Sequence, residues 1–299
     1  MAITSFPGGM ATPVEPCPRI PPRVAAAVPA EAQQASYGTP LGRIDVAVAS
    51  SCGAQHPCND DAHSTLPGVG MLFVVADGVG GGAMAQLASR ELVARLHEAL
   101  DARRLDAGLV CRAVLDADRA IARRIAARTE RPGAATVVLC APVNAFASKW
   151  LIGWVGDCRA YRLAMGGGET RIEPLTRDDT FRHLDEAPPR GGSPDDPARM
   201  VGNGATTGAS VAIHDLPPGD LLALCSDGVH KHLGAGDWRR VLMQRVSLAQ
   251  RCEDLVAVAR ANGSADDATV LLLQRVGVAI PGAAWARFAR PAPDSGSGR

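Results

Sequence analysis

The sequence has 299 residues, of which 46% are hydrophobic, and its 31 basic side chains are balanced by 31 acidic ones. That length is enough to bury a large core, and 21% charged residues with a slightly positive mean hydropathy exclude global disorder. A formal net charge of zero argues against a nucleic-acid partner and gives little attraction to an anionic membrane. Only Lys149 and Lys231 are lysines, and all other basic residues are arginines.

The cysteines and the apolar segments indicate a reduced, non-membrane protein. Eight cysteines are present, but no two form a Cys-x-x-Cys pair and no histidine follows one at zinc-finger spacing. Several lie in apolar runs, such as Cys140 and Cys225, so we expect buried thiols rather than disulfides or zinc ligands. The N-terminus lacks the pattern of a signal peptide, and no apolar run reaches the roughly 18 residues of a membrane helix. We therefore expect a cytoplasmic location.

Hydrophobic periodicity divides the chain into a leader, one α+β domain and a tail. Residues 1–40 are rich in Pro and Ala without a sustained period, which predicts a flexible leader, and the domain is expected over 41–278 with a tail over 279–299. Apolar runs predict strands over 44–49, 71–76, 136–141, 150–155, 160–163, 170–174, 221–225 and 269–274. Helical spacing predicts helices over 84–100, 109–125, 238–246 and 248–261, and 178–203 is expected to be a long loop.

Aspartates at the ends of apolar runs, or in the turns beside them, are the candidate chemical groups: Asp61, Asp77, Asp157, Asp227 and Asp266. Each alone is typical of a turn or a helix cap, and Asp157 is open to an ion pair with Arg159 or Arg162. The repetition of a strand that ends in a carboxylate indicates more, because converging carboxylates repel one another unless a cation neutralises them. Oxygen ligands of this kind suit Mg²⁺ or Mn²⁺ rather than zinc.

Seven segments carry a resemblance to a known family and follow its order along the chain. They are GAQHPCNDDAHS, FVVADGVGGGAMAQLAS, GAATVVLCA, WVGDCRAYRL, LTRDDT, LPPGDLLALCSDGVHKHL and GSADDATVLLL, and they span residues from about 40 to 276. Together they resemble the metal-dependent protein serine/threonine phosphatases of type 2C, and the DGVGG cluster resembles the bacterial members. The resemblance implies a four-layer α-β-β-α sandwich of two antiparallel sheets flanked by helix pairs, with a dinuclear metal site at the sheet edge.

The resemblance also implies metal ligands. Asp77 would bridge two Mn²⁺ or Mg²⁺ ions, the carbonyl of Gly78 would bind one of them, and Asp227 and Asp266 would complete the shell of the first ion. A hydroxide shared by the two ions would attack the substrate phosphorus in line, without a covalent phosphoenzyme.

Three further aspartates are assigned in the same way. Asp60 and Asp61 match the acidic pair that serves the second ion directly or through water. Asp157 falls where bacterial members place a ligand for a weaker third ion. The expected cofactor is therefore two Mn²⁺ or Mg²⁺ ions, with a third at Asp157.

The chain departs from the family pattern at three places. His56 stands where the family has an arginine that grips the substrate phosphate, so we expect a weaker contact that improves as His56 protonates below about pH 6.5. The flap after LTRDDT is short, and its Asp178-Asp179 pair replaces Asp-His, so substrate choice does not carry over. Asp267 follows Asp266 where asparagine is usual, which adds a negative charge that need not touch a metal.

The remaining charged residues are expected to be solvated. His230 and His232 are predicted to lie at an exposed helix start, and the arginines between residues 103 and 131 predict an exposed helix face with ion pairs rather than a nucleic-acid patch. Most candidate ligands lie in the windows 44–89, 200–230 and 261–274, which contain no Lys or Arg. We therefore expect a strongly acidic cleft without metal.

The leading hypothesis is hydrolysis of phosphoserine and phosphothreonine in proteins, reversing the action of a bacterial Ser/Thr kinase. The expected partners are phosphorylated proteins, among them the kinase or its targets, and the protein is expected to be a monomer without nucleic-acid or membrane partners. One alternative is a pseudophosphatase that binds phosphoproteins without turnover, which His56 favours and the intact aspartates disfavour. Another is a phosphatase domain that regulates a partner switch through anti-sigma antagonist proteins.

Overall fold

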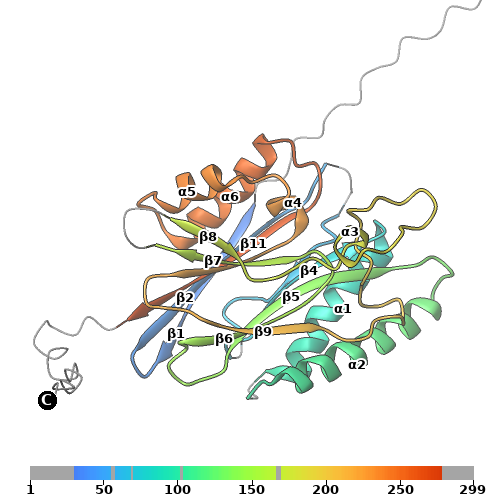
Figure 1. Cartoon of the computed structure of the whole chain (residues 1–299), viewed down its shortest axis with the longest axis horizontal. Helices are drawn as coiled ribbons and strands as arrows, with labels where there is room; N and C mark the ends of the chain where they lie inside the picture. The colour runs from blue at the N-terminus through green and yellow to red at the C-terminus, as the bar shows by residue number, and fades with distance from the viewer. Residues whose placement is uncertain (1–29, 55–57, 69, 102–103, 166–169, 278–299) are drawn as a thin grey trace, which may run out of the picture.

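The computed structural model describes residues 30–54, 58–68, 70–101, 104–165 and 170–277. Its strands form two antiparallel sheets that pack face to face, and helices cover the outer face of each sheet (Figure 1). The four-layer α-β-β-α sandwich implied by the resemblance is confirmed.

The two sheets have different sizes, and all their neighbouring strands are antiparallel. The six-stranded sheet has the order β1-β2-β11-β10-β7-β8, with bounds β1 Glu31–Thr39, β2 Gly42–Ser51, β11 Ala268–Gly277, β10 Leu221–Cys225, β7 Arg159–Ala164 and β8 Arg171–Pro174. The five-stranded sheet has the order β3-β4-β5-β6-β9, with bounds β3 Ala62–His63, β4 Phe73–Val79, β5 Ala134–Pro142, β6 Lys149–Val155 and β9 Ser210–Asp215.

Helices form the two outer layers. Their bounds are α1 Ala83–Leu100, α2 Ala107–Ala126, α3 Phe181–Leu184, α4 Asp227–His230, α5 Ala235–Leu242 and α6 Leu248–Ala261. The pair α1 and α2 packs on the five-stranded sheet, whereas α5 and α6 lie over the six-stranded one (Figure 1). Both longer pairs contain a helix with a side-chain cap: Asp106 accepts the Leu109 N–H at the start of α2, and Ser247 accepts the Gln250 N–H at the start of α6.

The core between the sheets explains why several strands read as continuous apolar runs. β5 is buried at every position from Ala134 to Ala141, because the other sheet covers one face and α1 and α2 cover the other. Between the sheets, the rings of Phe73 and Trp150 stack with centroids 6.2 Å apart. Burial of such aromatic pairs fixes the spacing of the two sheets.

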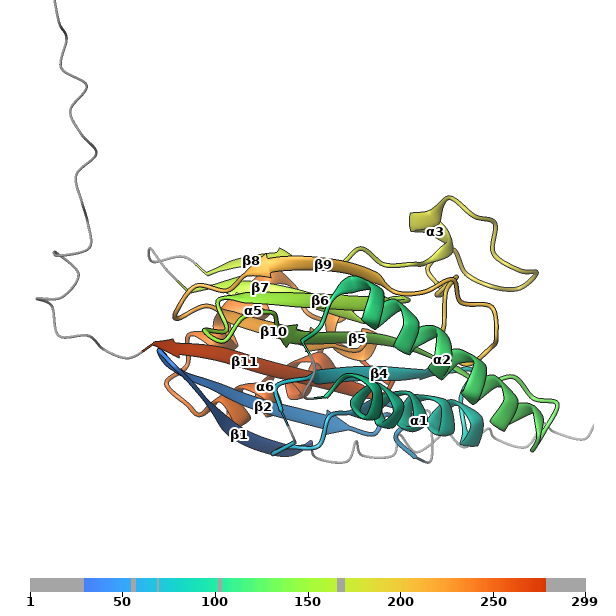
Figure 2. The same cartoon turned by 90° about the horizontal axis from the view of Figure 1, so that it is seen from below.

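All predicted strands and helices are present, with boundaries that differ by a few residues. The predicted long loop over 178–203 holds one short helix, α3, and its segment projects beyond the sheets (Figure 2). β3 and β9 were not predicted. β9 has a half-exposed pattern, SVAIHD, at the edge of its sheet, where only part of the strand needs apolar residues.

The predicted leader is too long at its C-terminal end. Glu31–Thr39 forms β1, which pairs with β2 from Glu31 opposite Ser50 to Thr39 opposite Gly42. The strand was missed because it lies at a sheet edge and carries the polar run EAQQ. Residues 1–29 and 278–299, which hold the rest of the predicted leader and tail, lie outside the described residues.

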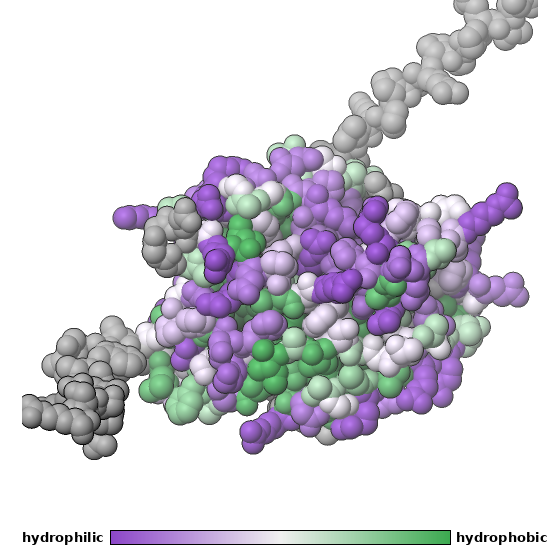
Figure 3. Space-filling model, viewed as in Figure 1, coloured by the Kyte–Doolittle hydropathy of each residue, from purple (hydrophilic) through white to green (hydrophobic). Residues whose placement is uncertain are grey.

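The surface is largely hydrophilic on the face seen in Figure 3. Hydrophobic side chains gather below the centre of that view, around β9, where Ile213 is 58% exposed. No helix in the described part of the chain is long and apolar enough to cross a membrane.

The aromatic contact between the sheets is testable by truncation. Phe73 is fully buried, so Phe73→Ala should lower the free energy of unfolding by about 3–5 kcal/mol through lost burial and a residual cavity. The matched control is Phe146→Ala, because Phe146 is 46% exposed and its truncation should change stability by no more than about 0.5 kcal/mol. Urea denaturation measures both. Equal effects of the two variants would contradict this assignment of the core.

Candidate metal centre

The fold brings the candidate aspartates to one end of the sandwich. Asp77 lies near the end of β4 opposite Thr136 of β5, and Asp157 follows the end of β6. In the other sheet, Asp227 follows β10 and Asp266 precedes β11. Because β4, β6 and β10 end where β11 begins in an antiparallel arrangement, the four carboxylates arrive at the same end from distant parts of the sequence.

Asp61 joins them from the segment before β3. Its side chain is held by two hydroxyls, because Ser226 Oγ donates to Oδ2 at 2.8 Å and Thr269 Oγ1 donates to the same oxygen at 2.7 Å. Oδ1 is buried and has no hydrogen-bond partner among the described residues. A buried carboxylate oxygen without a partner is costly, so this atom fits a site at which a cation binds.

The electrostatics of the cluster favour a cation for the same reason. Burial raises the pKa of Asp61 to about 8, opposed by its two hydroxyl donors and supported by nearby carboxylates. Burial also raises the pKa of Asp77 well above its ordinary value, and the charges of four carboxylates add to the shift, namely those of Asp227, Asp61, Asp157 and Asp266. The fold thus holds these carboxylates close together although burial and mutual repulsion disfavour their charged forms. A divalent cation would offset both effects.

Lys231 supplies a positive charge that the sequence analysis did not anticipate. Its Nζ donates to Asp157 Oδ2 at 2.9 Å and to Asp227 Oδ2 at 2.7 Å. Burial tends to raise the pKa of Asp227, but the charge and hydrogen bond of Lys231 lower it below its ordinary value. The pKa of Asp157 is raised to about 6, chiefly by burial and by Asp227, with Lys231 opposing. Lys231 thus supplies a counter-charge from just beyond the window 200–230, which itself contains no Lys or Arg.

The candidate ligands lie at one end of the sandwich, but among the described residues they do not form a preassembled metal site. Among the described residues, no three Asp, Glu, His or Cys side chains are placed so that they could together hold a metal. The donors nevertheless match Mn²⁺ or Mg²⁺ in type, since they are carboxylate and carbonyl oxygens.

Glycine at position 78 is required by the close approach of neighbouring backbone. A Cβ on Gly78 would lie 2.6 Å from the carbonyl oxygen of Ala85 and 2.8 Å from that of Asp60. Gly78 therefore lets the end of β4 lie directly against the start of α1 and the loop of Asp60.

Asp60 and Asp267 build that loop. Asp267 Oδ2 accepts the N–H of Asp60 at 2.6 Å and its Oδ1 accepts the N–H of Gly53 at 2.7 Å. Asp60 Oδ2 in turn accepts the N–H of Gly82, the N-cap of α1, at 2.7 Å. The aspartate in place of the family's usual asparagine thus has a structural role, because both its oxygens accept backbone N–H groups.

The LTRDDT segment is hydrogen-bonded to residues at the end of the sandwich where the candidate aspartates lie. Asp178 accepts two hydrogen bonds from Arg159, at 2.8 and 2.7 Å, and Asp179 Oδ2 accepts the N–H of Gly156 at 3.1 Å. Arg159 is therefore not a partner of Asp157, and neither is Arg162, which pairs with Asp220.

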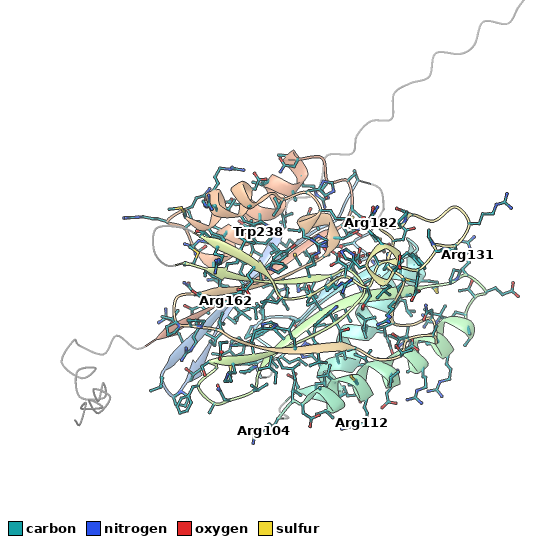
Figure 4. All side chains as sticks on the ribbon, in the orientation of Figure 1. Arg104, Arg112, Arg131, Arg162, Arg182 and Trp238 are labelled. Atoms are coloured by element: carbon teal, nitrogen blue, oxygen red, sulfur yellow. The ribbon has the colours of Figure 1, made fainter. Side chains whose placement is uncertain are left out.

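Three surface predictions have mixed outcomes. His230 is buried rather than solvated, and its Nε2 donates to the carbonyl of Asp157 at 2.8 Å, whereas His232 is half-buried. Along α2, Arg119 pairs with Asp116 and Arg124 with Glu91, as expected for an exposed helix face. Figure 4 shows Arg104 and Arg112 at the outer edge of this layer.

A buried aspartate of α2 holds the end of the flap in place. Asp118 of α2 is buried, and its Oδ1 accepts the N–H groups of Gly202 and Gly204 at 2.6 and 3.0 Å, which fixes the end of the flap.

His56, the predicted phosphate contact, lies outside the described residues. The described cysteines are free thiols, as predicted; Cys140, Cys158, Cys225 and Cys252 are buried, whereas Cys52 and Cys111 are half-buried and Cys58 is exposed.

Comparisons with known proteins agree with this fold. The sequence model described as Protein phosphatase 2C matches residues 49–266. The solved structure of PppA, "a key regulatory component of T6SS in Pseudomonas aeruginosa", is 26% identical with a TM-score of 0.65, over 80% of this chain and 99% of that one. A comparison with curated protein sequences gives no match.

Two further solved structures share the fold at lower identity. The catalytic domain of the serine threonine protein phosphatase PstP, in complex with 2 manganese ions, is 22% identical with a TM-score of 0.65, over 78% of this chain and 98% of that one. The serine/threonine phosphatase Stp1 from Staphylococcus aureus is 21% identical with a TM-score of 0.65, over 82% of this chain and 99% of that one.

The fold and the family model together define the class of protein. The chain belongs to the protein phosphatase 2C family, whose model covers most of its length. It is accordingly a protein serine/threonine phosphatase.

Asp267→Asn tests the loop that carries Asp60. An asparagine can accept only one of the two backbone N–H groups, so we expect a loss of about 1–3 kcal/mol in the free energy of unfolding. Chemical denaturation of metal-free protein provides the value, with Asp116→Asn as the exposed control because the Asp116 side chain is 76% exposed. Unchanged stability of Asp267→Asn would show that the loop does not depend on this carboxylate.

Metal binding should be visible as thermal stabilisation. Because burial raises the pKa of Asp61 in the folded state to about 8, folding without metal at neutral pH requires this carboxyl to take up a proton, which costs stability. Asp61→Asn should therefore raise the Tm of the EDTA-treated protein, by about 2–4 °C for each kcal/mol relieved, and reduce the rise that Mn²⁺ produces. Differential scanning calorimetry measures both. Asp215→Asn is the control, since Asp215 is 68% exposed and should alter neither value. An Asp61→Asn variant with the full Mn²⁺ effect would contradict the proposed role of this carboxylate.

Proposed function

We propose that the acidic edge is a dinuclear metal centre that hydrolyses phosphoserine and phosphothreonine in proteins. The proposed ligands are the carboxylates and one carbonyl that converge there, with Asp60 acting directly or through water: Asp60, Asp61, Asp77, the carbonyl of Gly78, Asp227 and Asp266. The observation that supports the proposal most directly is Asp61, whose Oδ1 is buried without a partner among the described residues while two hydroxyls hold Oδ2.

The residues around the ligands would keep them in place during turnover. Ser226 and Thr269 fix Asp61, and Asp267 fixes the backbone at Asp60. Asp77 pairs with Thr136 of β5, and the residue before it in β4, Ala76, pairs with Ala62 of β3. When bound, Mn²⁺ or Mg²⁺ would supply an activated water at neutral pH and offset the charge of the transferring phosphoryl group. A rigid sheet edge places these groups with little rearrangement cost at the moment of reaction.

The proposed substrates are phosphorylated proteins, and the proposed role is to reverse a bacterial Ser/Thr kinase. The α3 segment supports a protein substrate, because it projects beyond the sheets (Figure 2) and begins next to Asp178 and Asp179, which are tied to the loop of Asp157. The α3 segment would therefore be able to contact the residues of a substrate protein that flank its phosphorylated side chain.

A phosphoprotein-binding module without turnover is the second candidate. It is favoured by His56, which stands where the family has an arginine that grips the substrate phosphate. The same assay separates the two functions.

Hydrolysis of p-nitrophenyl phosphate and of a phosphothreonine peptide, with and without Mn²⁺, tests the proposal. We expect Mn²⁺-dependent turnover, and Asp77→Asn should lower kcat/KM by a factor on the order of 10²–10³ or more, because the variant removes charge from the proposed bridging position. Asp215→Asn, an exposed aspartate that pairs with Lys149, should retain wild-type rates. Absence of metal-dependent turnover, with Asp77→Asn equal to wild type, would favour the binding module instead.

A further inference from the structure

Lys231 lies between two carboxylates of the centre. It follows α4 directly and stands four residues after Asp227, so its side chain returns along the helix toward that residue. Nζ is 2.7 Å from Asp227 Oδ2 and 2.9 Å from Asp157 Oδ2. One ammonium group thus bridges a carboxylate from each sheet.

Asp157 depends on this segment for its other interaction as well. Its side chain is 3% exposed, and its carbonyl accepts a hydrogen bond from Nε2 of the buried His230. The nearby arginines are engaged elsewhere, Arg159 with Asp178 and Arg162 with Asp220. Lys231 is therefore the cation that compensates Asp157 among the ion pairs of the described residues.

We propose that Lys231 is an internal cation that takes the place of a third metal ion between Asp157 and Asp227. The inference rests on the proposed dinuclear centre and refines it: two ions bind, and Asp157 coordinates neither while Lys231 is in position. Lys231 is a positioning residue, because it contacts Asp157 Oδ2 and Asp227 Oδ2 and does not itself touch substrate.

The chemistry of the ammonium group supports this role. It carries a permanent positive charge, has three N–H donors and accepts nothing, so it satisfies two carboxylate oxygens at once. Unlike a divalent ion, it is covalently attached and is not removed by chelators. A divalent ion entering between Asp157 and Asp227 would meet the positive charge of Lys231 and would have to displace it.

The number of bound Mn²⁺ ions tests the proposal directly. Full-length protein is stripped with EDTA, dialysed and titrated with Mn²⁺, and the bound ions are counted by equilibrium dialysis with metal analysis. Wild type and Lys231→Arg, which keeps the charge, should bind two ions. Lys231→Met should bind a third, with an affinity at that position at least about tenfold higher than in wild type. The matched control is Lys149→Met, because Lys149 is the other lysine of the chain and forms an exposed pair with Asp215; it should bind two.

Asp157 provides the second arm. Asp157→Asn should leave the count at two in the presence of Lys231, since Asp157 is not a ligand there. In the double variant Lys231→Met/Asp157→Asn, the third ion should be lost again. The Asp157→Asn measurement can be made even if Lys231→Met is poorly stable, and a count below two ions in Asp157→Asn would contradict the proposal.

Thermal stability gives an independent measurement. In EDTA, Lys231→Met should lower the Tm by about 4–8 °C, because two carboxylates lose their counter-charge, and saturating Mn²⁺ should remove that difference. Lys149→Met should match wild type in both conditions.

The proposal is overturned if wild type binds three ions, if Asp157→Asn lowers the wild-type count, or if Lys231→Met binds the same number of ions as wild type at the same affinity. These outcomes are independent of the proposed activity. A protein that binds two ions without hydrolysing phosphate esters would refute the proposed function but leave the role of Lys231 intact.

Discussion

Repulsion among carboxylates at one end of the sandwich is the interaction on which the site depends. Asp61, Asp77, Asp157, Asp227 and Asp266 are close enough that burial and mutual charge raise the pKa of Asp77 well above its ordinary value. Such an arrangement is unfavourable in isolation and is retained only where a cation compensates it. In this protein Lys231 supplies part of the compensation, and we propose that divalent ions supply the rest.

The two-sheet scaffold keeps the carboxylates close together despite their mutual repulsion. Each carboxylate is attached to a strand end whose neighbours are buried, so repulsion cannot simply push the groups apart into solvent. The loops are fixed by further acidic residues with purely structural partners: Asp267 binds the backbone at Gly53 and Asp60, and Asp118 binds that of Gly202 and Gly204. Acidic residues in this protein therefore serve two purposes, and only their hydrogen bonds separate the structural ones from the candidate ligands.

Much of the fold could be predicted from the sequence because buried strands are apolar throughout. β5 and β10 are buried along nearly their whole length and are largely apolar, and β4 is apolar from Phe73 to Ala76; the resemblance supplied their arrangement. β1 could not be predicted, since a polar edge strand is stabilised by its pairing with β2 rather than by its own side chains. The candidate aspartates were found because each lies next to such a run. The contact of Lys231 with Asp157 joins residues 74 positions apart, and a charge window along the sequence does not show such contacts. Its pair with Asp227, four positions away, could have been predicted from helical spacing.

Diffraction from crystals soaked in Mn²⁺, with anomalous maps calculated at the manganese edge, tests the central claim most directly. The account predicts two peaks at the edge of the sandwich, on either side of Asp77 and in contact with Asp61, Asp227 and Asp266, and no peak between Asp157 and Asp227. Peaks elsewhere, or no peak beside Asp77 at saturating Mn²⁺, would contradict it.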